Sequence, residues 1–123
     1  MSVSIEEAAR FQQEKAREQS EKCAALHARA SADFARMVTF IRKQYPHVGI
    51  FQWGSILQPD SFDELSDVDI ALTEVTSPRE YFEIQGTLMK MTDFPLDCIE
   101  LDKISPENRE MLLRKGKWIH EPK

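Results

Sequence analysis

Two aspartates one residue apart, Asp67 and Asp69, are the residues of this sequence best suited to chemistry. A short apolar run ends in Gly54-Ser55, a polar loop follows, and the two aspartates then open a second apolar run over residues 68–75. Because side chains alternate along a strand, both carboxylates are expected on the same face of a sheet. Two neighbouring carboxylates repel each other unless a cation lies between them, and hard oxygen ligands favour Mg²⁺.

The Gly-Ser pair upstream adds an element that can bind phosphate. A glycine allows the backbone to approach a ligand closely, and the amide and hydroxyl of Ser55 can donate hydrogen bonds to phosphate oxygens. Gly54 and Ser55 together with the aspartates therefore predict a site for a divalent metal and a phosphate-bearing ligand. Each motif alone is also typical of an ordinary turn, so the prediction depends on their combination.

A third carboxylate is available in the run LDCIEL, residues 96–101, which reads as another strand. Alternation places its two acids, Asp97 and Glu100, on opposite faces. Asp97 shares its face with Ile99 and Leu101, the more apolar side, and is the better candidate for a third ligand. Three converging carboxylates could hold two metal ions, one lowering the pKa of an attacking hydroxyl and the other stabilising a leaving pyrophosphate.

A long helix is expected to precede the site. Residues 4–45 contain no Gly or Pro and are rich in helix-forming residues. The second half has an apolar stripe that predicts packing on the core; its members are Leu26, Ala30, Phe34, Met37, Val38, Ile41 and Tyr45. The first half is more polar on that face, which leaves two interpretations open: a solvated extension, or an arm that packs on a partner or a second copy of the chain. We therefore divide the chain into an N-terminal helical extension, 1–25, and a folded domain, 26–123.

The remaining elements alternate between strands and helices. Apolar runs predict strands over 47–53, 68–75 and 96–101, with a short extension at 118–120, and two Ser-Pro pairs each predict the start of a helix, over 78–91 and 106–114. The predicted fold class is α/β (α+β), with a mixed three- to four-stranded sheet flanked by helices.

Composition restricts the classes of function. The chain has 123 residues and a net charge of -5, which argues against a broad nucleic-acid-binding surface. No run is long and apolar enough to cross a membrane, and the N-terminal residues lack the apolar segment of a signal peptide, so we expect a cytoplasmic protein. Cys23 and Cys98 have no metal-binding or redox spacing and are expected to be reduced thiols.

Gly54-Ser55, the segment SDVDIAL and the segment LDCIEL together resemble the minimal nucleotidyltransferases of the polymerase-β-like superfamily. The resemblance covers roughly residues 34–120 and gives residues 26–123 the character of a nucleotidyltransferase-like domain. Many members of that family are the antitoxin partners of helical HEPN-type proteins, and some adenylylate a tyrosine. The site residues that the resemblance implies are Asp67, Asp69 and Asp97 for metal binding and catalysis, and Gly54, Ser55 and Ser66 for the nucleotide.

The resemblance implies Mg²⁺-dependent transfer of a nucleoside monophosphate from ATP or another NTP to a hydroxyl, with two metal ions and a HEPN-type partner as the plausible acceptor. One segment departs from the family pattern. Relatives commonly carry basic residues directly after Gly-Ser, whereas this chain has the uncharged run 56–59 and then Asp60, Asp63 and Glu64. We refer to residues 56–66 as the acidic loop. The alternative that it raises is a catalytically weak or inactive module that neutralises a helical partner by direct contact.

Overall fold

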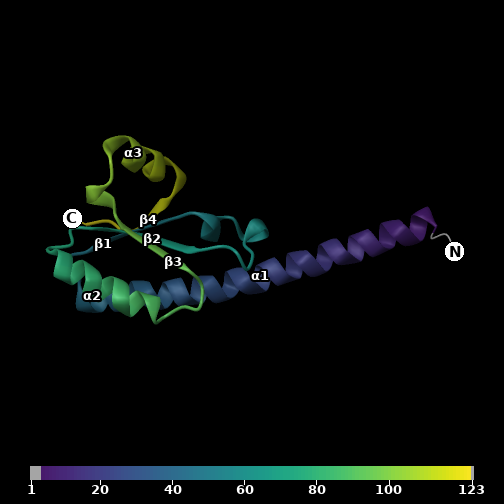
Figure 1. Cartoon of the computed structure of the whole chain (residues 1–123), viewed down its shortest axis with the longest axis horizontal. Helices are drawn as coiled ribbons and strands as arrows, with labels where there is room; N and C mark the ends of the chain where they lie inside the picture. Colours follow the sequence, from purple (N-terminus) through teal and green to yellow (C-terminus); the bar gives the residue numbers. More distant parts are fainter. Residues whose placement is uncertain (1–3, 123) are drawn as a thin grey trace.

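A four-stranded mixed sheet with three α-helices forms the described part of the chain, residues 4–122 of a computed structural model (Figure 1). The helices and strands, in chain order, are α1 (Ile5–Gln44), β1 (Gly49–Trp53), β2 (Val68–Thr73), α2 (Pro78–Met89), β3 (Leu96–Glu100), α3 (Pro106–Lys115) and β4 (Lys117–His120). Short 3₁₀ turns occupy η1 (Ser55–Leu57), η2 (Pro59–Ser61) and η3 (Leu101–Lys103). This arrangement confirms the predicted fold class.

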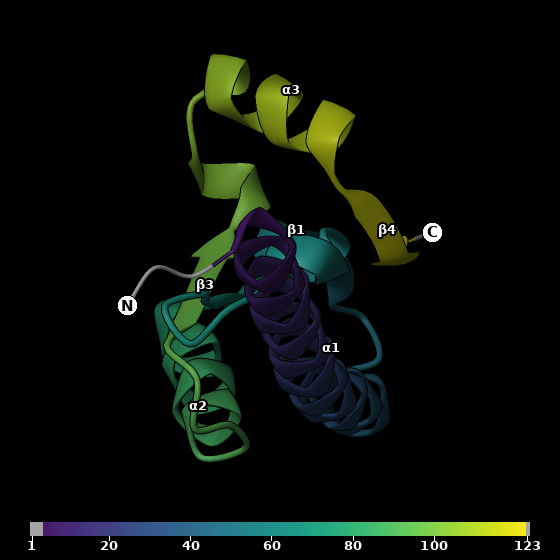
Figure 2. The ribbon, with the colours of Figure 1, turned by 90° about the vertical axis from the view of Figure 1, so that its right-hand side faces the viewer.

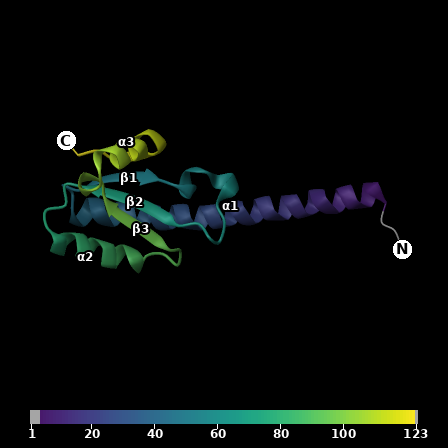
Figure 3. The same cartoon turned by 45° about the horizontal axis from the view of Figure 1, so that its top comes forward.

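The first helix is longer than the domain that it supports. Its N-cap is Ser4, whose Oγ accepts a hydrogen bond from the Glu7 amide at 3.1 Å, and Pro46 follows shortly after its C-terminal end. Every residue from 5 to 22 is exposed, and this part of α1, which we call the arm, extends past the sheet into solvent (Figures 1 and 3). From Cys23 onward the predicted apolar stripe is buried; the buried members are Cys23, Ala30, Phe34, Met37 and Ile41.

The strand order is β3-β2-β1-β4, with β1 antiparallel to both neighbours and β2 parallel to β3. One face of the sheet packs against α1 and α2, and α3 lies on the other side (Figure 2). Alternation along β2 separates the two faces: Val68, Ile70 and Leu72 belong to the larger core, while Ala71 joins a smaller cluster that includes Leu112 of α3. The candidate site lies on the α3 side of the sheet.

Two segments differ from the expected boundaries. The second strand ends at Thr73 instead of residue 75, because Glu74 adopts a left-handed conformation with φ of 61° and donates its amide to Asp102 Oδ2 at 2.9 Å. The segment after Gly54, expected as a loop with room for one helical turn, forms the two turns η1 and η2.

Both cysteines are free and buried, in agreement with their expected role as unpaired thiols. Within residues 4–122, no helix combines the length and the apolar character that crossing a membrane requires.

Candidate active site

Three side chains form a row across the sheet at the end nearest the arm. The strand register pairs Trp53 with Asp69 across β1 and β2, and pairs Asp69 with Asp97 across β2 and β3. Register partners point to the same face of a sheet, so Asp69 and Asp97 are neighbours on the α3 side, and Asp67 lies two residues before Asp69, just outside β2. Asp69 is only 8% exposed, while Asp67 and Asp97 are exposed.

The Gly-Ser turn meets this row directly. Gly54 has φ of 87°, a conformation that side chains other than glycine rarely adopt, and a Cβ added to it would lie 1.9 Å from Asp69 Oδ2. The backbone of Gly54 therefore lies against the buried carboxylate. The half-buried Ser55 follows at the start of η1, so the phosphate-binding candidates and the metal-binding candidates, twelve or more residues apart in sequence, meet at one place.

Ser66 has a different environment from the other predicted nucleotide ligands. It is 8% exposed, and its hydroxyl accepts a hydrogen bond from the Asp63 amide at 3.0 Å and donates to Asp63 Oδ1 at 3.3 Å. These bonds close the turn that leads from the acidic loop into β2. The hydroxyl thus stabilises this turn through its hydrogen bonds to Asp63, and a role for Ser66 in nucleotide binding remains a prediction.

The electrostatics of the row are dominated by uncompensated negative charge. Burial, the largest cause, and the negative charges of Asp97 and then Asp67 together raise the pKa of the Asp69 carboxyl from 3.8 to about 7. Among the hydrogen bonds and ion pairs within residues 4–122, none involves the side chain of Asp67, Asp69 or Asp97. A cation bound here would reduce the electrostatic repulsion between the buried Asp69 carboxylate and its two acidic neighbours.

The donor set fits a hard divalent cation such as Mg²⁺, which usually takes one or two protein carboxylates and completes its shell with water and substrate phosphate. Asp69 and Asp97, paired in register, are the residues that would hold it, with Asp67 beside them. In the described part of the chain, no three His, Cys, Asp or Glu side chains come close enough together to form a metal-binding group on their own. A site completed by the phosphate ligand is therefore the arrangement that these residues fit.

The acidic loop is anchored on α1. Ile56 and Phe62 are buried in the larger core, and the Ile56 carbonyl oxygen lies 2.6 Å from Nε2 of His27. An ion pair of 3.2 Å joins Lys22 Nζ to Glu64 Oε2. The apolar residues Ile56 and Phe62 thus fix the loop to the helix, and residues 56–66 contain no Lys or Arg that could place a cation at the site.

Trp53 flanks Asp69 in the row and is partly buried against the cluster of Phe51, Ala71 and Leu101. Its position before Gly54 is compatible with packing or with stacking on a base, and the contacts favour packing. The sequence contains the residue but has no pattern that would place it beside an acid on the neighbouring strand.

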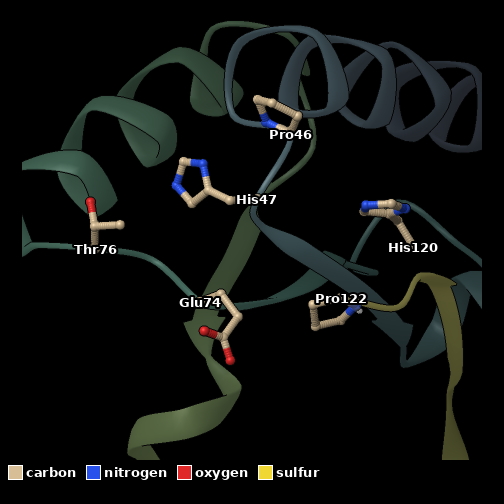
Figure 4. A pocket seen from close by; sticks show the side chains of 6 residues that line it. All are labelled: Pro46, His47, Glu74, Thr76, His120 and Pro122. Atoms are coloured by element: carbon tan, nitrogen blue, oxygen red, sulfur yellow. The ribbon is translucent and has the colours of Figure 1, made fainter.

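A separate pocket of about 590 Å³ lies at the opposite end of the sheet, where β2 and β4 finish (Figure 4). Its lining residues are Pro46, His47, Glu74, Thr76, His120 and Pro122. His47 is already engaged, with Nε2 at 2.7 Å from Oε1 of Glu80. No sequence motif predicted this pocket, because its residues come from three separate segments.

Comparison with known proteins bears on the fold. No protein-family model matches the chain, and no curated protein matches it. A chain from a crystal structure of a mutant form of the toxin–antitoxin MntA-HpeT superposes with a TM-score of 0.56 at 22% identity, covering 69% of each chain. A second mutant form of that complex gives a TM-score of 0.56 at 20% identity, covering 68% of this chain and 69% of that one. A chain from a crystal structure of the toxin–antitoxin with AMP-PNP gives 0.56 at 22% identity, again covering 68% and 69%.

At these identities the likeness concerns the fold alone. The chain shares the α+β fold of these toxin–antitoxin chains, and in it a long N-terminal helix precedes the four-stranded sheet.

Proposed function

We propose that this protein is a Mg²⁺-dependent nucleotidyltransferase that moves a nucleoside monophosphate from an NTP, with ATP as the first candidate, to a hydroxyl group. The observation that carries the proposal is the contact between the Gly54 backbone and the Asp69 carboxylate, where an added Cβ would lie 1.9 Å from Oδ2. That contact brings the Gly-Ser turn, our candidate for binding phosphate, to a buried acid whose side chain has no ion-pair partner among residues 4–122. The register partner Asp97 then places a second carboxylate beside it.

Each residue has a defined task in this proposal. Gly54 has no side chain and so lets the turn lie against the Asp69 carboxylate, and the amide and hydroxyl of Ser55 donate hydrogen bonds to the oxygens of a phosphate bound there. Asp69 and Asp97 hold the cation, Asp67 contributes from the mouth of the site, and Asp97 accepts the proton of the acceptor hydroxyl. Bound Mg²⁺ would lower the pKa of that hydroxyl and stabilise the negative charge of the leaving pyrophosphate.

We further propose that the acceptor lies on a helical partner protein of the HEPN type and that the chain acts as an antitoxin. Support comes from the structural neighbours, which are chains of toxin–antitoxin crystal structures, one of them with AMP-PNP. The net charge of -5 and the exposed acids at the site favour a protein partner over a nucleic acid.

A second candidate function follows from the acidic loop. Ile56 and Leu57 supply packing contacts instead of cations, and the loop adds the negative charges of Asp60, Asp63 and Glu64 between Ser55 and Asp67. An additional negative charge about 4 Å from a phosphate costs about 1 kcal/mol in water. The alternative is therefore a module that retains the fold, transfers nucleotide slowly or not at all, and neutralises a helical partner by direct contact.

Isothermal titration with ATP and MgCl₂ tests the first proposal. We expect binding by the wild type and its loss in the Asp67→Ala/Asp69→Ala double variant. The matched control is Asp93→Ala, because the Asp93 side chain is 96% exposed and lies outside the row of acids. Absence of binding in the wild type, or equal binding in the double variant, would refute the proposed site.

Inhibition of a co-expressed helical toxin separates the two candidates. If the chain acts by transfer, the wild type protects cells and the double variant does not, and the toxin gains the mass of one nucleotide only with the wild type. If it acts by contact, both proteins bind the toxin and protect equally. Loss of toxin binding in a folded double variant would count against the contact mechanism.

A further inference from the structure

The arm has no packing partner within the described chain, although it is a regular helix. Eighteen residues, 5–22, are exposed and span about 27 Å at 1.5 Å per residue. Helices draw most of their stability from an apolar face that packs on another element. Two of its large apolar side chains, Ile5 and Phe11, are 89% and 66% exposed. The arm therefore presents surface that the rest of the molecule does not use.

One face of the arm is free of charge. Ile5, Ala9, Gln12, Ala16 and Gln19 follow steps of three and four and lie on one side of the helix, whereas the charged residues of the arm occupy the remaining circumference. The same steps continue into the buried stripe that starts at Cys23. The uncharged face therefore points to the side of α1 on which the folded domain lies, and a helix seated on this face would abut the end of the domain.

We propose that a second copy of this chain occupies the uncharged face, with the two arms packed antiparallel about a two-fold axis near residue 14. This register sets Gln12 opposite Ala16 of the second copy and Ala9 opposite Gln19 of the second copy. Both glutamines of the face then meet an alanine, so that a long side chain packs against a short one. A parallel pair in register would instead set glutamine against glutamine and alanine against alanine.

The ends of the arm are also self-complementary in this arrangement. Leu65, 86% exposed, lies in the acidic loop at the base of the arm, next to the Glu64 that pairs with Lys22. Ile5 is at the tip. In the antiparallel pair each tip reaches the base of the other copy, so the two most exposed large apolar side chains of the described residues meet twice by symmetry.

The size of the contact is adequate for a specific dimer. Two helices about 27 Å long and about 10 Å wide bury on the order of 1,000 Å² when packed along their full length. The folded domains lie at opposite ends of the paired arms, so they do not compete for space. This inference concerns assembly and does not depend on nucleotide transfer.

Light scattering coupled to gel filtration of the full chain at tens of micromolar tests the proposal. We expect about twice the mass of the chain for the wild type and the mass of one chain for Ala16→Glu, which places a charge in the interface. The matched control is Ala25→Glu, since Ala25 is exposed and, nine residues away, lies on the opposite side of the same helix. A monomeric wild type, a dimeric Ala16→Glu, or equal loss in both variants would overturn the proposal.

Spin-label distances test the direction of the arms. Cysteines introduced by Glu7→Cys, Glu14→Cys and Glu21→Cys lie on the charged face, and both native thiols are buried. In the antiparallel dimer the axial separation is near zero at position 14 and about 21 Å at positions 7 and 21. Equal separations at all three positions, or no intermolecular separation at any of them, would overturn the antiparallel arrangement.

Discussion

Replacing Asp69 by asparagine is expected to stabilise the metal-free protein at neutral pH and to abolish binding of Mg²⁺ at the proposed site. The carboxyl is 8% exposed, and its pKa is raised to about 7 from 3.8 by burial and then by Asp97 and Asp67. The pKa of Asp69 in the folded chain lies about three units above its ordinary value, and each unit corresponds to about 1.4 kcal/mol. Ionisation of Asp69 therefore lowers the free energy of unfolding by about 4 kcal/mol. The neutral amide has the shape of the protonated acid and avoids that cost.

The sign of the pH dependence follows from the same pKa. Below about pH 4 the carboxyl is protonated in the folded and the unfolded chain, and Asp69→Asn should have the stability of the wild type. Between about pH 4 and pH 7 the unfolded chain loses the proton while the folded chain keeps it, so the wild type loses stability as the pH rises. Above about pH 7 both states are ionised, and the advantage of the variant reaches its full value.

Urea unfolding of both proteins at pH 4, 6 and 8 measures this directly, with Asp93→Asn as the control for removal of an exposed acid. MgCl₂ at pH 8 should stabilise the wild type but not Asp69→Asn, because the cation needs the carboxylate. The reasoning is refuted if Asp69→Asn is less stable than the wild type at pH 8, or if the two proteins show the same pH dependence.

Three further variants follow from the structure. Gly54→Ala should lower the free energy of unfolding in urea by more than about 2 kcal/mol, because it combines a φ of 87° with a clash against Asp69. Gly86→Ala, where an added Cβ meets nothing within 4 Å, lies inside α2 and should raise that free energy by about 0.5–1 kcal/mol. Equal effects of the two variants would contradict the contact between Gly54 and Asp69. Tyr81→Phe should cost about 1 kcal/mol, because the hydroxyl donates to the Cys98 carbonyl oxygen at 2.6 Å, and an unchanged urea midpoint would argue against that bond. A chain lacking residues 1–20 should keep its near-ultraviolet circular dichroism and lose any dependence of its melting temperature on protein concentration; a collapsed spectrum would show that the arm is part of the fold.

Local sequence features predicted most of the secondary structure. The absence of Gly and Pro over residues 4–45 predicted one continuous helix, and the two Ser-Pro pairs predicted the starts of α2 and α3, where Ser77 and Ser105 accept the expected capping hydrogen bonds. The end of β2 was predicted two residues too late, because the left-handed conformation of Glu74 depends on a partner 28 residues away, the Asp102 carboxylate. A bond between distant segments has no counterpart in a local pattern.

Alternation along the strands was sufficient to nominate Asp67, Asp69 and Asp97, since it required only a period of two. What the strand pattern could not provide was the pairing of β2 with β3 in the register that sets Asp69 beside Asp97. The sequence also could not show that the Ser66 hydroxyl is taken up by Asp63, or that residues 56–62 are anchored on α1. The catalytic role of the three aspartates stays a prediction.

The sequence by itself determined which residues could do chemistry here, because residue type and local spacing fix what a side chain can bind and which side of its own strand it occupies. Only the tertiary structure decided that Gly54 and Asp69 touch, that Asp69 is buried with no cationic side chain of residues 4–122 paired to it, and that the arm is exposed along residues 5–22. Contact and burial depend on how distant segments pack, and the free energy of a charge depends on what surrounds it. The sequence therefore supplied the residue types of the candidate site, and packing set the burial and the pKa of Asp69 within it.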